Sequence, residues 1–363
     1  MSSSKTKILL ISASGKTGGG PSHLFLLKDL LKDEFDFYLA MPFLNPKIKN
    51  YNKKKYLEIS ERRISLIDIL RLIKFSRKNS IDIVHAHGKG AGLIARIIKI
   101  FLHKPLIYTF HGIHTHCLSR LNRFLYIFYE NITGWLDDEK VFVSKSERKQ
   151  TKYLKIFIGK NNRIINNSTR EMSSIKINTK KNNFKIGIDN NKKNIISICR
   201  LVDQKNIFEI FNIAEKLQIY NFIVLGEGSL LEKAKIYLKN KDIKNVFLLG
   251  NQKDIFNYLY ESDLFLSTSL YEGHPISILE AMSIGLPIVA SKVTGNVDTI
   301  KNEISGFFYR LGDIKQASFL IEKIMKNNAL KLQLSNNSFF THRKLFTTSK
   351  MKNSYISLYK KYY

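Results

Sequence analysis

Short apolar runs alternate with amphipathic stretches along most of this chain, and this alternation restricts the possible folds more than any other feature. The runs form two series, at residues 6–12, 36–41, 81–86, 106–110 and 140–143, and at residues 194–199, 221–225, 245–249, 263–267 and 287–290. Strands that alternate with helices favour parallel sheets covered by helices on both faces. The two series therefore predict two doubly wound α/β domains.

The length of 363 residues suits two domains of ordinary size. A polar, lysine-rich stretch from Asn166 to Lys193 separates the two series and is interpreted as a linker with a partly flexible loop. Apolar residues at helical spacing predict a last helix near the C-terminus. These residues are Met351, Tyr355, Leu358 and Tyr359.

Several features of the chain predict a cytoplasmic protein. No run of about 18 apolar residues is present, so no transmembrane helix is expected. The N-terminus leads directly into a strand-like run at Ile8 and lacks a small-residue cleavage site, so no signal peptide is expected. The two cysteines, Cys117 and Cys199, do not form a disulfide framework.

The formal net charge of +29 leaves three explanations open. The first is compositional drift, because lysine, asparagine and isoleucine are abundant together, as an AT-rich genome would produce. The second is attraction to an anionic membrane surface, where each nearby basic residue contributes about 1 kcal/mol. The third is nucleic-acid binding, which is weakened because no nucleic-acid-binding motif is found.

Three segments combine basic residues with helical apolar periodicity, at residues 66–75, 93–102 and 120–129. Basic amphipathic helices can lie on membranes. More often they cover a sheet, so their apolar faces are expected to pack in the core. Their lysine and arginine rims could still face a membrane.

Residues 271–282, at a predicted strand end, carry the strongest chemical signal. The chain passes through Gly273 and is expected to begin a helix at about Pro275, since proline is favoured in a first helical turn. The free N–H groups and positive dipole end of such a helix suit a phosphate. Glu272 before the helix and Glu280 on its second turn would repel phosphate and are expected to hold hydroxyl groups. Hydroxyls beside phosphate indicate a sugar nucleotide.

Basic and glycine residues follow other strands of the second series. Arg200 offers a planar guanidinium and Lys205 a compact ammonium group, and both suit a diphosphate. Glycine turns at two further strand ends contain Gly226 and Gly250. Because ligands of doubly wound sheets bind beyond the carboxyl ends of the strands, these residues are candidates for the same site.

A glycine turn at residues 18–20 follows the first strand and allows the backbone to approach a ligand closely. The preceding residues 15–17 read Gly-Lys-Thr and imitate a phosphate-binding P-loop. Leu10 stands where that motif requires an earlier glycine, so the P-loop interpretation fails.

Histidines end two strands of the first series. His85 and His87 end one strand and His111 ends another, a position where histidines are often structural. A candidate zinc group comprises His111, His114, His116 and Cys117. It places three histidines within six residues of one loop with no second cysteine nearby, so no metal site is expected.

Residues 271–282, with Glu272 and Glu280 eight positions apart, resemble the glutamate-x7-glutamate motif of retaining GT-B glycosyltransferases, most closely glycosyltransferase family 4. Arg200 and Lys205 resemble the Arg-x4-Lys pair of that family, and the resemblance covers nearly the whole chain. It implies the GT-B fold, in which two Rossmann-like domains face each other across a cleft. It also implies an acceptor-side domain, a nucleotide-sugar-binding domain and a returning C-terminal helix, at residues 1–168, 169–345 and 346–363.

The resemblance further implies a role for each candidate residue. Arg200, Lys205 and the helix start after residue 273 would bind the leaving diphosphate. Glu272 would hold hydroxyls of the donor sugar, Glu280 would bind the ribose, and His111 would support the sugar near the anomeric carbon. The implied donor-binding residues are Gly19, Gly20, Gly226, Gly250, Gly273, His274, Pro275, Ile276 and Glu280. In this family picture the leaving phosphate oxygen takes the acceptor's proton, so no metal and no cofactor is expected, and a UDP-sugar is the favoured donor.

Two places depart from the family pattern. Thr294 and Asp298 stand where the family often has the first glycine and the glutamate of Gly-Gly-x-x-Glu, and His274 replaces a more usual apolar residue. These changes bear on the identity of the donor sugar more than on the reaction.

Charge and family together predict transfer of a hexose or N-acetylhexosamine to a lipid-diphosphate-linked glycan, for O-antigen or capsule polysaccharide. The enzyme would lie on the inner face of the cytoplasmic membrane, with an anionic membrane surface and no nucleic acid as partner. Two alternatives remain open. A sugar-nucleotide 2-epimerase of the same fold would act without an acceptor, and a basic nucleic-acid-binding protein would ignore sugar nucleotides.

Overall fold

The computed structural model describes residues 5–15, 18–44, 46–49, 51–63, 65–113, 115, 118–170, 188–189 and 191–363. The chain forms two compact units, an N-terminal unit of Met1–Asn167 with Thr348–Tyr363 and a C-terminal unit of Ser168–Thr347. The sequence-based division places its boundaries after residues 168 and 345. Much of the predicted linker lies outside the described residues.

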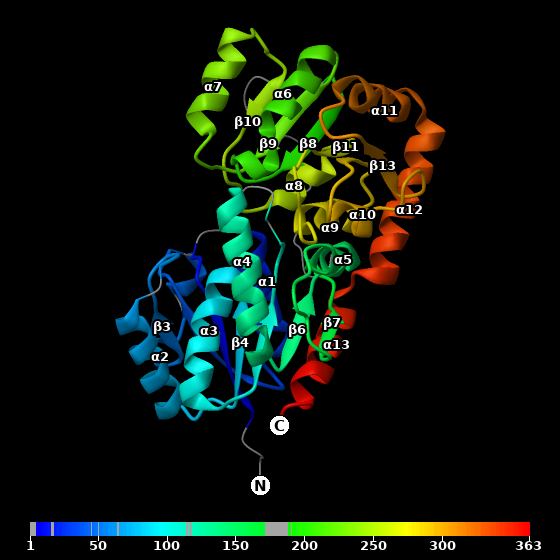
Figure 1. Ribbon diagram of the computed structural model, residues 1–363. Coiled ribbons are helices and arrows are strands. Elements are labelled where there is room, and N and C mark those ends of the chain that lie inside the picture. The colour runs from blue at the N-terminus through cyan, green and yellow to red at the C-terminus, as the bar shows by residue number, and fades with distance from the viewer. Residues whose placement is uncertain are drawn as a thin grey trace. The chain divides into compact units, whose positions relative to one another are not determined.

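The N-terminal unit contains a parallel sheet with strand order β3-β2-β1-β4-β5-β6-β7 (Figure 1). Its strands are β1 (Lys7–Ser12), β2 (Asp36–Met41), β3 (Tyr56–Glu58), β4 (Ile83–His87), β5 (Leu106–Thr109), β6 (Glu139–Phe142) and β7 (Asn162–Ile164). All strands expected in this half are present. The sequence does not predict β3 and β7, because each is three residues long and only partly buried, and so lacks a buried apolar run.

Helices cover both faces of this sheet. They are α1 (Gly19–Leu31), α2 (Leu66–Lys78), α3 (Lys89–Leu102), α4 (Arg120–Thr133), α5 (Lys145–Tyr153) and α13 (Thr348–Lys360). Alternate residues of β1 point to opposite faces. Ile8 and Leu10 pack with α1 and α13, whereas Leu9 and Ile11 pack with α2 and α3. The C-terminal helix α13 thus belongs to the core of the N-terminal unit.

The C-terminal unit repeats this architecture with strand order β10-β9-β8-β11-β12-β13. Its strands are β8 (Asn194–Ile198), β9 (Asn221–Leu225), β10 (Val246–Leu248), β11 (Leu264–Ser267), β12 (Ile288–Ser291) and β13 (Gly306–Tyr309). Its helices are α6 (Ile207–Lys216), α7 (Leu231–Asn240), α8 (Ile255–Tyr260), α9 (Ile276–Ser283), α10 (Asn296–Thr299), α11 (Ile314–Lys326) and α12 (Asn328–Leu345). The unexpected strand β13 begins with a glycine, which weakens the strand signal.

Both sheets therefore have the doubly wound topology that the sequence predicts. The strand order reverses beside β1 in one unit and beside β8 in the other, and such switch points are where this fold class binds ligands.

The expected core packing of the basic amphipathic segments is only partly correct. Helix α3 packs on the sheet through Ile94 and Ile98. In α4, however, Glu130 is the fully buried residue, whereas Phe124 and Phe128 are exposed. The prediction is therefore only partly right for α4, because Tyr126 and Ile127 pack against the core but share the inner side of the helix with a buried group of charged side chains.

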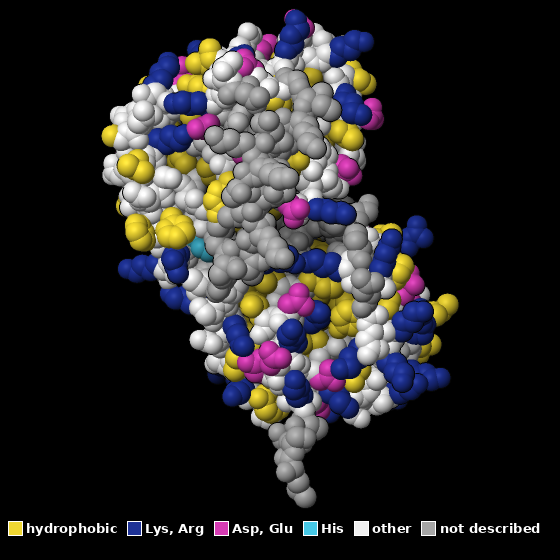
Figure 2. All heavy atoms as spheres, turned by 180° about the vertical axis from the view of Figure 1, so that it is seen from behind, with side chains coloured by type: hydrophobic (Ala, Val, Ile, Leu, Met, Phe, Trp, Pro, Cys, Tyr) yellow, Lys and Arg dark blue, Asp and Glu magenta, His cyan; other side chains and the backbone are white. Residues whose placement is uncertain are grey.

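Lysine and arginine side chains are spread over both units on the face seen in Figure 2, with acidic side chains among them. On this face the positive charge does not gather into one patch, which fits a compositional origin for part of it. No helix in the described part of the chain is long and apolar enough to span a bilayer.

Candidate active site

The candidate residues lie at the carboxyl ends of strands in both sheets. In the C-terminal unit, Arg200 follows β8, Gly226 follows β9, Gly250 follows β10 and Glu272 follows β11. In the N-terminal unit, His111 follows β5. Parallel strands bring these positions to one edge of each sheet, as the sequence predicts.

The buried Glu272 forms an ion pair with the partly buried Lys205, in which Lys205 Nζ lies 2.5 Å from Glu272 Oε1. The hydroxyl of Ser269 donates to the same carboxylate oxygen at 2.7 Å. The hydroxyl of Thr268 donates to the backbone carbonyl of Lys205 at 2.9 Å and so fixes the lysine loop. Sequence reasoning assigns the two charges to different parts of a donor and does not predict this pairing.

Arg200 is the less constrained of the two predicted diphosphate-binding cations. Its Nη2 donates to Gln204 Oε1 at 3.5 Å, and Gln204 in turn donates to the carbonyl of Tyr271 at 3.0 Å. Within the described residues Arg200 has no carboxylate within ion-pair distance. Its positive charge therefore remains available to an anion, whereas that of Lys205 is balanced by Glu272.

Glycine is required where neighbouring loops meet at this edge. Gly226 has a φ of 131°, and a Cβ there would lie 2.0 Å from the carbonyl oxygen of Cys199. The N–H of Gly226 donates to the carbonyl of Gly250 at 2.8 Å. Gly295 has a φ of 85°, and a Cβ there would lie 2.8 Å from Glu272. The glycine turns thus bring backbone against the ion pair and the loop after β8.

Helix α9 begins one residue later than expected. Pro275 is the N-cap residue with extended backbone, so Ile276 is the first helical residue. Gly273 and His274 before it are buried. The ring of His274 lies edge-on to Phe346 with centroids 5.0 Å apart, which accounts for part of its packing.

Glu280 lies on the second turn of α9 and is half-buried. Burial raises the pKa of its carboxyl group to about 8, and the charge of Arg170 opposes this shift. Sequence reasoning treats Glu280 as an ionised acceptor. In this structure its carboxyl group is mainly protonated near neutral pH, and can donate as well as accept a hydrogen bond.

Gly19 and Gly20 are the first two residues of α1, directly beyond the carboxyl end of β1. A Cβ at either position would meet no neighbouring atom within 4 Å, so local packing does not require glycine there. Lys16 and Thr17 of the P-loop imitation lie outside the described residues.

The loop carrying His111 is held by a buried carboxylate. His111 has a φ of 58°, in the left-handed region that is uncommon for residues other than glycine. The next N–H, of Gly112, donates to Glu147, which also accepts from the N–H of Val143 at 2.7 Å. Glu147 of α5 therefore ties the end of β5 to the end of β6.

His111 belongs to a cluster of buried histidines. Its Nε2 lies 2.9 Å from Nδ1 of His87, and its ring lies edge-on to His23 at 4.7 Å. Burial lowers the pKa of His85, His87 and His111 well below its usual range, and the charges of neighbouring imidazoles lower it further. Burial likewise lowers the pKa of His23 to about 4. These imidazoles are therefore uncharged at neutral pH.

Helix α13 supplies hydroxyl groups to this cluster. The hydroxyl of Tyr355 lies 3.1 Å from His23 Nε2, and that of Tyr359 lies 2.7 Å from His85 Nδ1. Thr109 Oγ1 lies 2.8 Å from the other nitrogen of His85. Sequence reasoning notes the two tyrosines only as a helical pattern and gives His23 no role, because the contacts join residues far apart in the chain.

Three of these histidines could hold a metal ion. The ligating nitrogens of His23, His87 and His111 lie within 4.8 Å of one another. Neutral imidazoles suit divalent metals, but a metal here would have to displace the hydrogen bond between His87 and His111. In the candidate group of the sequence, His114, His116 and Cys117 lie outside the described residues. The expected absence of a metal stays a prediction.

Family models match both halves of the chain. The model described as Glycosyltransferase Family 4 matches residues 17–168, and the model described as Glycosyl transferases group 1 matches residues 178–339. The solved structure of Anabaena Alr3699/HepE in complex with UDP and glucose has a TM-score of 0.83 at 17% identity, and covers 98% of this chain and 99% of that chain. That likeness shows the shared fold.

Curated relatives extend the match. The chain is 29% identical over 293 residues to the Escherichia coli UDP-Gal:alpha-D-GlcNAc-diphosphoundecaprenol alpha-1,3-galactosyltransferase, covering 76% of this chain and 75% of that protein. It is 23% identical over 289 residues to the Staphylococcus aureus capsular polysaccharide biosynthesis glycosyltransferase CapM, covering 75% of this chain and 74% of that protein. The fold and site thus define a GT-B glycosyltransferase. The chain belongs to the family 4-like glycosyltransferases, as its motifs predict, and its relatives serve bacterial polysaccharide biosynthesis.

Proposed function

We propose that this glycosyltransferase moves a hexose or N-acetylhexosamine from a UDP-sugar to a hydroxyl of a lipid-diphosphate-linked glycan, with retention of the anomeric configuration. The names of its relatives support the donor and acceptor classes, since one names UDP-Gal and a diphosphoundecaprenol-linked sugar. The Anabaena neighbour contains UDP and glucose. The product would enter a surface polysaccharide such as O-antigen or capsule.

The observation that carries this proposal is the buried Glu272–Lys205 pair beside Arg200 at the switch point of the C-terminal sheet. A diphosphate here would meet the uncompensated guanidinium of Arg200 and the backbone N–H groups at the start of α9. Glu272, held in place by Lys205 and Ser269, would accept hydrogen bonds from donor-sugar hydroxyls. Glu280 would bind the ribose.

Transfer would proceed on one face of the sugar. The bond between the anomeric carbon and the diphosphate oxygen breaks, and Arg200 and Lys205 stabilise the negative charge that develops on the leaving group. The acceptor oxygen bonds to the anomeric carbon from the same face, and its proton passes to the leaving phosphate oxygen. The basic residues would take the place of a metal ion, and no cofactor would be needed.

His111 would support the donor sugar near the anomeric carbon. Its imidazole is held by His87 and its backbone by Glu147 through the next residue. An uncharged imidazole can accept a hydrogen bond from a sugar hydroxyl or donate one to it, and it does not attract the phosphate groups. This property suits a residue that contacts the sugar rather than the diphosphate.

Because the proposed acceptor is lipid-linked, we further propose that the enzyme works at the inner face of the cytoplasmic membrane, with an anionic lipid surface as its partner. The net charge of +29 supports such an attraction.

The test is a screen of UDP-, GDP- and ADP-sugars by thermal shift and by transfer to a short-chain lipid-diphosphate sugar. A UDP-sugar should stabilise the protein and be consumed, and NMR of the product should show the anomeric configuration of the donor. Glu272→Gln should abolish transfer while the protein stays folded, whereas Glu232→Gln on the exposed surface should not. An inverted product, or full activity in Glu272→Gln, would refute the proposal.

A further inference from the structure

Helix α4 packs Tyr126, Ile127 and Glu130 toward the protein and leaves a separate apolar stripe exposed to solvent. Glu130 is the fully buried residue of this helix. The exposed side, here called the α4 face, consists of Leu121, Phe124, Leu125, Phe128, Ile132 and Trp135, the last in the 3-10 helix that follows. At about 100° per residue, the helical members of this face share one side of α4, and Glu130 lies about half a turn from Leu121.

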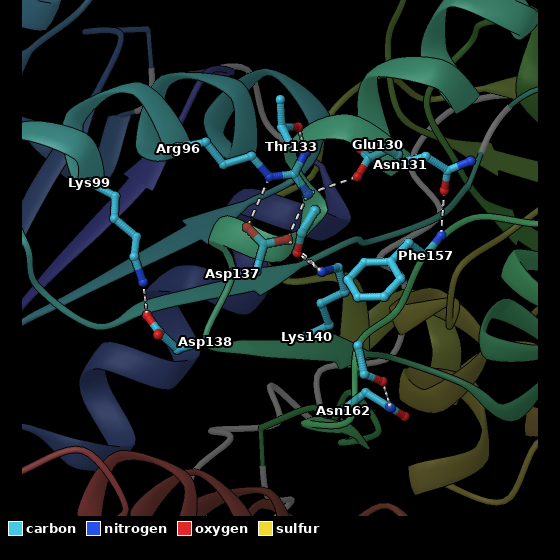
Figure 3. A network of polar contacts seen from close by, with 12 residues as sticks. Arg96, Lys99, Glu130, Asn131, Thr133, Asp137, Asp138, Lys140, Phe157 and Asn162 are labelled. Carbon is cyan, nitrogen blue, oxygen red and sulfur yellow. Dashed lines mark hydrogen bonds and ion pairs between the residues drawn. The ribbon is translucent and has the colours of Figure 1, made fainter.

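A buried network of charged groups holds α4 from its inner side (Figure 3). Arg96 of α3 donates to Glu130 at 2.8 Å and to Thr133 at 2.9 Å, both on α4. It also donates to both carboxylate oxygens of Asp137, which pairs with Lys140 at 2.9 Å. Two positive and two negative groups therefore balance, and these polar contacts hold α4 together with the packing of Tyr126 and Ile127 on the core.

Folding alone does not explain this orientation. A buried ionic network is seldom more stabilising than apolar packing of the same volume, because its charges lose their hydration. A helix with the composition of α4 would gain more by burying its leucines and phenylalanines. Continuous exposed apolar surface of this kind usually marks a site of interaction.

The surroundings of the α4 face are positively charged. Arg120 is exposed on α4 itself, next to this face. Asn131 of α4 donates to the backbone carbonyl of Lys155 at 3.1 Å and accepts from the N–H of Phe157 at 2.6 Å, so this second segment lies beside the helix. Within residues 152–160 of this segment, the exposed basic residues are Lys152, Lys155 and Lys160. The acidic residues within 118–135 and 143–160 are Glu130 and Glu147, and both are buried.

We propose that the α4 face docks on an anionic lipid bilayer, with its aromatic and aliphatic side chains in the headgroup boundary and its basic rim on the lipid phosphates. An apolar helical stripe flanked by lysine and arginine is the pattern of helices that lie in the membrane interface, where tryptophan is also enriched. A second copy of the chain is the weaker candidate, because its α4 face would bring an equally basic rim against this one. This proposal depends on the proposed function in one respect only, namely that the acceptor is linked to a lipid.

The single tryptophan of the chain gives a direct probe, because Trp135 lies in the α4 face and is 70% exposed. The full chain is mixed with phosphatidylcholine vesicles, either without an anionic lipid or with about 30% phosphatidylglycerol. Anionic vesicles should blue-shift the Trp135 emission, protect it from acrylamide and carry the protein into the pellet. Unchanged emission together with protein in the supernatant at physiological salt would overturn the proposal.

Matched variants separate this face from general charge attraction. Phe124→Asp should lower vesicle partitioning by about tenfold or more, since it places a carboxylate in the headgroup boundary. Phe319→Asp on α11 is the control, because both phenylalanines are 63% exposed and the charge change is the same. Equal binding of the two variants would refute docking through α4. Concentration-dependent dimers that Phe124→Asp dissolves, without vesicle binding, would favour a second copy instead.

A transfer assay keeps this proposal separate from the proposed function. With a short-chain acceptor in solution, Phe124→Asp should transfer as fast as the wild type. With a long-chain acceptor in anionic vesicles, it should lose about tenfold in rate, in line with its weaker binding. Docking without any transfer would leave the α4 face intact and refute the function. Transfer without docking would refute docking through the α4 face and leave the proposed function intact.

Discussion

The two units place different chemistry at corresponding edges of similar sheets. In the C-terminal unit, formally charged groups follow the strands, and Lys205 and Glu272 are paired in a buried site with Arg200 nearby. In the N-terminal unit, the corresponding positions carry His87 and His111, which are held uncharged by burial. One topology thus supports an ion pair at one edge, here called the ionic edge, and uncharged imidazoles at the other, here called the neutral edge, and the two differ in these side chains at the strand ends. The ionic edge suits a diphosphate, and the neutral edge suits uncharged hydroxyl groups.

The sharpest way to break this contrast is to remove one charge from the ionic edge. Lys205→Met leaves the Glu272 carboxylate buried without its cation, so we expect a loss of about 3–5 kcal/mol in the free energy of unfolding. Transfer should fall on the order of a thousandfold, because a group that stabilises the leaving diphosphate is gone. Chemical denaturation and initial rates measure the two effects.

The double variant Lys205→Met with Glu272→Gln separates stability from chemistry. It should regain most of the lost stability, since no buried charge is left unpaired, but it should stay inactive. Lys235→Met, in an exposed ion pair with Glu232, is the control and should change neither quantity measurably. A fully active double variant would show that the buried pair is purely structural.

Arg200 tests the unpaired cation of the same edge. Arg200→Lys keeps the charge but loses the planar fork, so kcat/KM should fall roughly tenfold to a hundredfold. Stability should not change, because Arg200 has no carboxylate partner among the described residues. Calorimetry should show weaker UDP binding, whereas Arg343→Lys on α12 should bind UDP as the wild type does. An unchanged UDP affinity in Arg200→Lys would remove this residue from the diphosphate site.

The neutral edge is tested by pH. Since burial holds the pKa of His87 and His111 well below its usual range, these imidazoles stay uncharged where a free histidine takes up its proton. We therefore expect kcat to show no step near pH 6.5, where free histidine titrates. His111→Ala should lower kcat by about tenfold without introducing such a step. A wild-type profile with an apparent pKa near 6.5 would show that a charged imidazole takes part.

Glu280 carries a smaller effect at the ionic edge. Its pKa is raised by burial to about 8, from a usual 4.5, so the folded state binds the proton more tightly than the unfolded state. This contribution to stability is fully present below pH 4.5 and is lost as the pH rises through 8. Between pH 5 and pH 8 the wild type should lose about 1 kcal/mol or more relative to Glu280→Gln. Thermal unfolding of both proteins at the two pH values measures it. Parallel curves for the two proteins would contradict the raised pKa.

The smallest expected effect is that of a chelator. If arginine and lysine neutralise the leaving diphosphate, EDTA should leave the transfer rate unchanged. Restoration of a lost activity by Mn²⁺ would contradict this. Stoichiometric zinc in the purified protein, lost in His87→Ala, would show instead that His23, His87 and His111 hold a metal.

Sequence periodicity predicts most of this fold because long apolar runs report burial directly. It fails where the apolar pattern does not correspond to the residues that are buried. Three-residue strands such as β3 and β7 carry too little pattern, and α4 has a strong apolar stripe that faces solvent because Arg96 draws Glu130 inward. Amphipathicity shows that a helix has two sides, but not which side the protein buries.

The candidate site divides in a similar way. Strand-end positions could be predicted, since parallel topology brings them to one edge. The pairing of Lys205 with Glu272 could not, because the residues are 67 positions apart and their charges suggested separate ligands. The contact between His23 and Tyr355 spans 332 positions and leaves no local signal. Motifs thus identify the residue types of a site, whereas long-range contacts determine which of these residues are paired and which are charged.

The place of α13 has a consequence for how the protein is made. Met351, Tyr355, Leu358 and Tyr359 close one face of the first sheet, although they are synthesised after the whole C-terminal unit. Domains generally fold as units during synthesis, in order from the N-terminus. Here the N-terminal unit cannot complete its core until α13 has been synthesised, so the C-terminal unit has all its residues first. The neutral edge, whose histidine cluster contacts Tyr355 and Tyr359, would then form after the ionic edge.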